Sequence, residues 1–175
     1  MKSMTDVAVT LVLAWSLGSM ISGLGTASFI VDTMQRMQFS PVLVPAFLFL
    51  FGAFVSFATG SSWGTFAIMM PLAIPMAHAF SIPYAIAAGA VLSGGLFGDH
   101  CSPISDTTIL SSTGAECELV EHVKTQLPYA VVNGVIAFAC YILVGFTYSP
   151  LVVLLAVALQ AAVILAWNRM DVKKV

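Results

Sequence analysis

The residues best suited to chemistry lie in one short segment, 98–108, which reads Gly-Asp-His-Cys-Ser-Pro-Ile-Ser-Asp-Thr-Thr. Two carboxylates, Asp99 and Asp106, and the imidazole of His100 fall within eight positions of one another. Hydroxyl groups lie between and beside them, at Ser102, Ser105 and Thr107. Carboxylate and hydroxyl oxygens bind hard cations, and a carboxylate also carries a proton. The segment therefore predicts a site for a small cation, for a proton, or for both.

The surrounding sequence has the composition of a membrane protein. Of its 175 residues, 59% are hydrophobic and only 8% are charged, and the mean hydropathy is +1.00. A soluble domain carries roughly 25% charged residues. The composition therefore excludes an ordinary soluble enzyme, a nucleic-acid-binding protein and a disordered chain. The three cysteines form no pattern typical of a zinc site or a disulfide framework, and we expect no cofactor.

Long apolar runs predict an all-α, polytopic transmembrane helical bundle with broken or re-entrant helices. A helical span needs about 20 apolar residues, so the chain has room for about five or six crossings in a single transmembrane domain over residues 1–175. Two prolines, Pro71 and Pro75, predict a bend in the third run. The charged stretch 116–126 is expected to form a short helix at the membrane interface. The apolar runs are 7–31, 41–58, 63–80, 83–97, 128–146 and 151–167.

The distribution of basic residues predicts the orientation of the last two spans. Lys124 precedes these spans, and Arg169, Lys173 and Lys174 follow them. Both ends of a helical hairpin lie on one side of the membrane, and basic loops favour the cytoplasm. We therefore expect a multi-pass protein of the plasma membrane whose C-terminus is cytoplasmic.

The chemistry-bearing segment is expected to break a helix at membrane depth. A charged residue at that depth costs at least about 2.5–3.5 kcal/mol on insertion scales, so its presence calls for a function. Gly94 and Gly98 have the spacing of a close helix contact. Ser102 before Pro103 is typical of an N-cap followed by the first helical residue, and Gly114 is a plausible C-terminal stop. An extramembrane loop is the alternative, but the segment contains no lysine, arginine or glutamate.

The two aspartates are expected to differ. Asp106 would lie at a helix N-terminus, where the helix dipole stabilises its ionised form. Asp99 would lie near a helix C-terminus in a desolvated place, so we expect it to hold its proton more tightly. We therefore predict that a hard cation binds at Asp106 and Asp99, helped by Ser102, Ser105 and Thr107, with Asp106 the better cation ligand and Asp99 the better proton carrier. For His100, a structural hydrogen bond is favoured over a proton relay.

Another break is predicted at 59–65, Thr-Gly-Ser-Ser-Trp-Gly-Thr, an uncharged cluster between two apolar runs. Gly60 could end one half-helix and Ser62 could cap the next. In one interpretation, Ser61, Ser62 and Thr65 face the break at 98–108 as additional oxygen ligands. In the other, the segment is a tight turn whose hydroxyl groups satisfy backbone groups.

These motifs resemble the signature of the NhaC-type Na⁺/H⁺ antiporters, within a wider superfamily of ion transporters. The long motif 98–108, followed by Ser-Ser-Thr-Gly-Ala at 111–115, is specific, and the segments 59–65, 14–18 and 24–27 resemble further motifs in the same order. The resemblance implies a secondary transporter that exchanges Na⁺ for H⁺ by competition at an intramembrane carboxylate site. It also implies that Asp99, Ser105, Asp106 and Thr107 lie in the ion path, with Ser61, Ser62 and Thr65 opposite.

The family's members are more than twice this long, and the resemblance covers their C-terminal part. We therefore expect the lipid bilayer and either an N-terminal half or further copies of the chain as partners, with no nucleic acid. The family also includes organic acid exchangers, such as malate against lactate, and the motif leaves the substrate open. A non-transporting membrane subunit is a further alternative. An intramembrane aspartyl protease is disfavoured, because its GxGD motif would need glycine where Phe97 stands, so we expect no enzyme.

Overall fold

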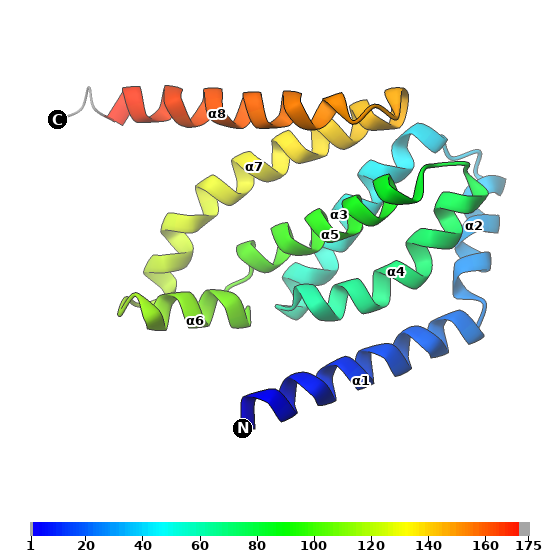
Figure 1. Ribbon diagram of the computed structural model, residues 1–175, viewed down its shortest axis with the longest axis horizontal. Coiled ribbons are helices and arrows are strands. Elements are labelled where there is room, and N and C mark those ends of the chain that lie inside the picture. The colour runs from blue at the N-terminus through cyan, green and yellow to red at the C-terminus, as the bar shows by residue number, and fades with distance from the viewer. Residues whose placement is uncertain (1, 172–175) are drawn as a thin grey trace.

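The computed structural model describes residues 2–171, and describes side chains from residue 16 to residue 166 and at residues 9, 12 and 13. Within these residues the chain forms eight α-helices, a short 3₁₀ helix and no strand (Figure 1), which confirms the all-α bundle. The elements are α1 (Lys2–Gly23), α2 (Thr26–Arg36), η1 (Pro41–Leu43), α3 (Val44–Thr59), α4 (Ser62–Ala79), α5 (Tyr84–Cys101), α6 (Asp106–Gly114), α7 (Leu119–Thr147) and α8 (Leu151–Asp171).

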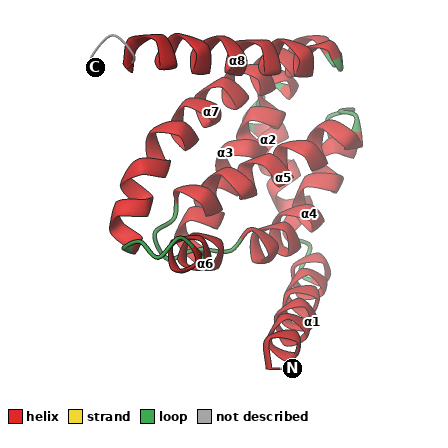
Figure 2. Ribbon diagram, turned by 60° about the vertical axis from the view of Figure 1, so that its left-hand side comes forward, coloured by secondary structure: helices red, strands yellow, loops and turns green. Residues whose placement is uncertain are grey.

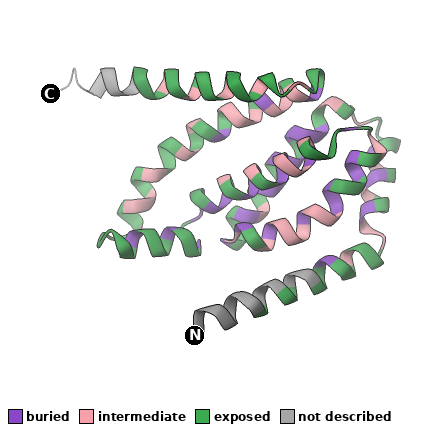
Figure 3. Ribbon diagram, in the orientation of Figure 1, coloured by how far each residue is buried: buried purple, intermediate pink, exposed green. Residues whose placement is uncertain are grey.

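The outside of the bundle is apolar, as a lipid environment requires. Two described segments, Pro41–Thr59 and Leu119–Thr147, are long and apolar enough to span a membrane, and Leu151–Ala166 in α8 is a shorter apolar helix. Large side chains such as Phe54 and Phe146 are more than two-thirds exposed. Figure 3 shows the buried residues concentrated on α3, α4 and α5, whereas α7 and α8 are largely exposed. The chain is therefore a membrane protein with a central core of three helices.

The closest packing joins α3 to α5. Phe49 of α3 lies against Gly94 of α5, and Ala53, one turn later, lies against Gly98. Because both contacts advance along the two chains together, α3 and α5 run in the same direction. A Cβ atom at Gly94 or Gly98 would overlap a carbonyl oxygen of α3, so only glycine permits this approach. The small-residue face expected from the sequence is thus the contact between these two helices.

The first apolar run, 7–31, is not one continuous span. It is divided between α1 and α2, which meet at a sharp angle (Figure 2). Gly25 produces the turn by adopting a left-handed conformation with φ of 68°. Gly18 has a different use, because a Cβ atom there would lie 3.0 Å from the carbonyl oxygen of Ala67 in α4. The chain therefore turns at Gly25, and α1 packs closely against α4 at Gly18.

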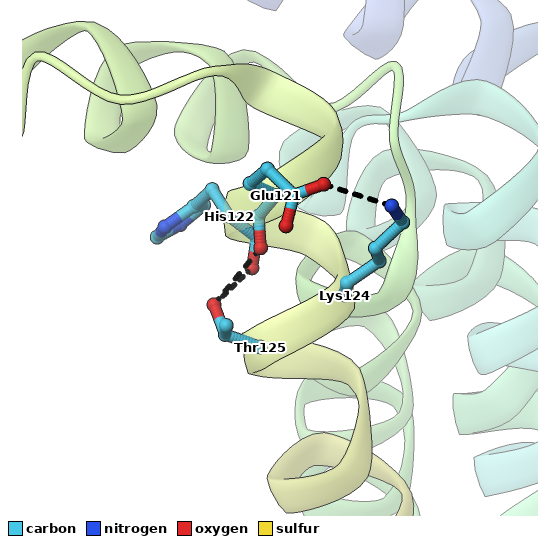
Figure 4. A network of polar contacts seen from close by, with 4 residues as sticks. All are labelled: Glu121, His122, Lys124 and Thr125. Atoms are coloured by element: carbon cyan, nitrogen blue, oxygen red, sulfur yellow. Dashed lines mark hydrogen bonds and ion pairs between the residues drawn. The ribbon is translucent and has the colours of Figure 1, made fainter.

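The prediction of a separate interfacial helix over the charged stretch 116–126 is wrong. α7 begins at Leu119 and continues through Pro128 without interruption. Figure 4 shows the exposed first turns of α7, where Lys124 Nζ lies 2.8 Å from Glu121 Oε1. Both charged side chains are more than 60% exposed, so this ion pair contributes little stability and marks a solvated helix end. The prolines of α4 likewise lie inside one helix, which bends along its length (Figure 1).

Candidate ion-binding site

Two interruptions of the helical backbone meet at one end of the core. The first lies between α3 and α4, and the second lies between α5 and α6. Because α3 and α5 run parallel and pack in register, their ends come to the same level. A Cβ atom at Gly60, in the first break, would lie 2.7 Å from the carbonyl oxygen of Ile104, in the second. The backbones of the two breaks therefore lie close together at Gly60 and Ile104.

The break between α5 and α6 differs in detail from the prediction. Ser102 is not an N-cap but the C-cap of α5, and Pro103 lies in the connection rather than in a helix. The N-cap of α6 is Ser105, whose Oγ accepts from the backbone N–H of Thr108 at 3.5 Å. Ser102 has the extended backbone that a residue before proline favours, with ψ of 125°, but α6 begins only at Asp106. The helix therefore restarts three residues later than expected.

The break between α3 and α4 is also capped one residue away from the expected position. Gly60 ends α3 as predicted, with φ of 67° and its N–H bonded to the carbonyl oxygen of Ser56. Ser61, not Ser62, is the N-cap of α4, because its Oγ accepts from the N–H of Gly64 at 3.2 Å. Thr65 donates to the carbonyl oxygen of Ser61 at 2.8 Å. The hydroxyls of Ser61 and Thr65 thus satisfy backbone groups, and the Ser62 side chain is buried.

The left-handed residue that follows α6 is not the glycine that the sequence predicted. Gly114 is the last residue of α6, but the left-handed conformation that favours glycine occurs two residues later, at Glu116, with φ of 53°. A Cβ atom at Gly114 would meet nothing within 4 Å. Neither conformation nor packing therefore requires glycine at this position.

The carboxylate of Asp99 lies at the centre of the second break and is 2% exposed. Its Oδ1 accepts from Ser105 Oγ, and its Oδ2 accepts from Thr107 Oγ1, each at 2.8 Å. The two hydroxyl oxygens are themselves 2.8 Å apart. We call these three residues, Asp99, Ser105 and Thr107, the Asp99 cluster. Its members come from the last turn of α5 and the first turn of α6, so the cluster holds the two half-helices together.

The Asp99 cluster has one proton too few when its carboxylate is ionised. Three oxygen–oxygen contacts link Oδ1 to Oδ2 through the two hydroxyls. Two hydroxyl protons can fill only two of these contacts, because an ionised carboxylate supplies none. One proton on the carboxylate completes all three hydrogen bonds. A cation can serve the same purpose, since it binds the excess lone pairs directly.

The structure separates the two aspartates that the sequence places together. Asp106 is the first residue of α6, as the helix-dipole argument required in outline, but its side chain is exposed and forms no hydrogen bond within the described residues. Asp99 is buried. The division of cation and proton binding between them stays a prediction. Among the described residues, no group of three or more His, Cys, Asp or Glu side chains could hold a metal ion.

His100 faces away from the Asp99 cluster, toward α7. The side-chain nitrogen of Gln126 donates to the carbonyl oxygen of His100 at 3.0 Å and lies 3.3 Å from its Nδ1. A carbonyl in the last turn of a helix lacks an intrahelical partner, so Gln126 satisfies it and fixes α7 to the break. This geometry supports the structural interpretation of His100. Both side chains line a cavity of about 350 Å³ between α5, α7 and α8, which Asn133 and Gln160 also line.

Two buried residues of this region were missed by sequence reasoning. Ser56 is 0% exposed and Thr108 is 2% exposed, and their hydroxyls have no hydrogen-bond partner in the described structure. The hydroxyl of Ser102, a residue that the sequence analysis did place in the site, also has no hydrogen-bond partner in the described structure. Ser56 could have been found, because it is the only hydroxyl residue in the apolar run 41–58. Thr108 gave no such signal among its polar neighbours.

Comparison with known proteins places the chain among transporters. The model of the Na⁺/H⁺ antiporter family matches residues 1–146. An uncharacterised protein of Haemophilus influenzae is 44% identical over 169 residues, which cover 94% of this chain and 32% of the relative. The malate-2H⁺/Na⁺-lactate antiporter of Bacillus subtilis is 38% identical over 95 residues, which cover 54% of this chain and 20% of the relative.

A further Haemophilus influenzae relative, described as an uncharacterised Na⁺/H⁺ antiporter, is 31% identical over 148 residues, which cover 85% of this chain and 31% of the relative. The chain thus spans about a third or less of the length of these relatives. No solved structure matches it. The family match, together with the apolar helical bundle, identifies the chain as a member of the Na⁺/H⁺ antiporter family.

Proposed function

We propose that the chain carries the ion site of a secondary transporter that exchanges Na⁺ for H⁺ across the membrane. The observation that carries the proposal is the proton count of the Asp99 cluster, in which one added proton completes three hydrogen bonds around a buried carboxylate. Na⁺ needs the ionised carboxylate as a ligand, and the proton removes that charge. Binding of one ion therefore excludes the other, and this exclusion couples the two fluxes.

The other residues predicted for the site have supporting roles in this proposal. Asp106 lies exposed beside Thr107 at the start of α6, where it would attract a cation toward the Asp99 cluster. Ser61, Ser62 and Thr65 shape the opposing break, which contacts the second break through Gly60. Irregular backbone at membrane depth is tolerated where it lines a cavity or is packed in protein, and transporters use broken helices for ion sites. The roles of these residues are part of the proposal.

The proposal also includes the membrane location and the assembly of the chain. We place it in the plasma membrane as a multi-pass protein with a cytoplasmic C-terminus, and we assign it transport rather than catalysis. The relatives are about three times longer, so the working transporter would contain either an N-terminal portion or further copies of the chain.

A Na⁺- or H⁺-coupled organic acid exchanger is a second candidate. It is favoured by the similarity to the malate-2H⁺/Na⁺-lactate antiporter. A carboxylate substrate would be attracted to a helix N-terminus. The N-terminus of α4, at Ser62, is uncharged and suits this role, whereas that of α6 bears Asp106. Counterflow of labelled malate or lactate, present in the chain's vesicles and lost in Asp99→Asn, would favour this candidate.

The transport proposal is tested in everted membrane vesicles from cells that lack their own Na⁺/H⁺ antiporters. Adding Na⁺ should dissipate a preformed pH gradient in vesicles with the wild-type chain and not in vesicles with Asp99→Asn. Choline in place of Na⁺ should have no effect, and antibody detection would establish equal amounts of the two proteins. Equal Na⁺-dependent dissipation with Asp99→Asn would refute the carboxylate mechanism.

A further inference from the structure

Three residues next to the Asp99 cluster carry buried hydroxyl groups that have no hydrogen-bond partner in the described structure. They belong to Ser56, Ser102 and Thr108, of which the first two are 0% exposed and the third is 2% exposed. Folded proteins pair the large majority of their buried polar side-chain atoms, so each exception requires an explanation. Three exceptions around a single buried carboxylate point to a ligand.

Each of the three hydroxyl residues is one contact away from the Asp99 cluster. The Cβ of Ser56 lies 2.8 Å from the position that a Cβ atom would take on the glycine preceding Asp99. The backbone N–H of Ser102 donates to the carbonyl oxygen of Asp99 at 3.1 Å. The backbone N–H of Thr108 donates to Ser105 Oγ at 3.5 Å. The three residues therefore lie next to the cluster, one on α3, one in the connection and one on α6.

The chemistry of these groups suits a hard monovalent cation. They supply neutral oxygen atoms beside one negative carboxylate, with no sulfur ligand among them. We propose that Ser56, Ser102 and Thr108 are further ligands of the cation that Asp99 binds, so that the cation links α3 to the break between α5 and α6. The inference rests on the proposed function, because it takes Asp99 as the charged ligand of Na⁺.

This arrangement gives Na⁺ and H⁺ different structural effects. A proton on Asp99 completes the hydrogen bonds of the Asp99 cluster and leaves the three surrounding hydroxyls unchanged. A cation coordinates Ser56 as well, and Ser56 belongs to α3. Only the cation therefore tightens α3 against the break, and a ligand shifts a conformational equilibrium by such a difference in contacts.

The test is the Na⁺ dependence of the melting temperature of the purified full chain in detergent, with choline chloride holding the ionic strength constant. A ligand that binds only the folded state raises its stability with concentration. For Ser56→Ala and Thr108→Val, the Na⁺ concentration that gives half of the rise should increase about tenfold, as expected for the loss of one oxygen ligand of a charged group. Their melting temperatures in choline alone should not fall, because these hydroxyls have no partner to lose.

Ser112→Ala is the matched control, because Ser112 is 4% exposed and its hydroxyl already bonds to the carbonyl oxygen of Ile109 at 2.9 Å. It should keep the wild-type Na⁺ dependence. Wild-type Na⁺ dependence in Ser56→Ala and Thr108→Val would overturn the inference, as would an equal loss of stability in choline and in Na⁺. If one of them does not fold, Ser102→Ala replaces it. A Na⁺ effect that survives in Asp99→Asn would instead overturn the proposed function itself.

Discussion

At the scale of single residues, the proposed exchange of ions depends on how completely Asp99 is enclosed. The side chain is 2% exposed and accepts hydrogen bonds from Ser105 and Thr107 on α6. Burial of an ionised group is costly unless it is paired or hydrogen-bonded. The two hydroxyls reduce this cost, but two protons cannot fill the three contacts of the Asp99 cluster. This incomplete pairing is the basis of the proposal that a proton and a cation compete for Asp99.

Ser105 has two uses, and its replacement should show both. Its hydroxyl caps α6 and donates to Asp99, so Ser105→Ala should lower the free energy of unfolding by about 1–2 kcal/mol. Ser111→Ala is the control, because the exposed Ser111 hydroxyl bonds only within α6, to the carbonyl oxygen of Thr107. That change should stay within about 0.5 kcal/mol. Thermal unfolding in detergent measures both, and equal losses would contradict the assigned role of Ser105.

Sequence reasoning at this scale succeeded where the signal is local. Gly60 was predicted to end α3, because a left-handed residue at a helix end favours glycine whatever surrounds it. The N-cap of α6 could not be predicted in the same way. Ser102 and Ser105 are both good capping residues, and the choice is decided by the contact of Ser105 with Asp99, six residues earlier. Such a contact exists only once the helices have broken and folded together.

At the scale of helices, the parallel packing of α3 and α5 positions both breaks. This packing depends on glycine at the contact, since a Cβ atom at Gly98 would overlap the carbonyl oxygen of Ala53. The spacing of Gly94 and Gly98 predicted the contact from the sequence. The sequence did not reveal that α7 continues through Pro128, because proline is favoured at the start of a helix and disfavoured in its interior.

Gly98→Ala and Gly114→Ala should therefore differ sharply, although both were predicted to be structural glycines. Gly98→Ala must separate α3 from α5 beside Asp99, and we expect it to cost about 1–3 kcal/mol and to weaken Na⁺ binding. Gly114→Ala meets open space in an ordinary helical conformation, so it should be neutral or stabilising by up to about 1 kcal/mol. Melting temperature and Na⁺ titration of the two purified variants provide the comparison. Similar behaviour of the two would show that the helix contact is not required.

At the scale of the whole molecule, polar and apolar groups are segregated. The buried polar side chains gather near the two breaks, and most of the large exposed side chains of α7 and α8 are apolar. These two helices are largely exposed (Figure 3). The fold class and the membrane setting follow from composition alone, because 8% charged residues cannot cover a soluble surface. The division of the first run into two helices does not follow from composition, since it occurs at the left-handed turn of Gly25.

The central claim, that Na⁺ and H⁺ compete for Asp99, is tested most directly by proton release from the purified chain in weakly buffered detergent. Na⁺ addition should release up to one proton per bound Na⁺, and the apparent Na⁺ affinity should fall up to about tenfold for each unit of falling pH while the site takes up its proton. Asp99→Asn should abolish the release, and Asp106→Asn, whose carboxylate is exposed, should retain it. Na⁺ binding without proton release, or release that persists in Asp99→Asn, would contradict the claim.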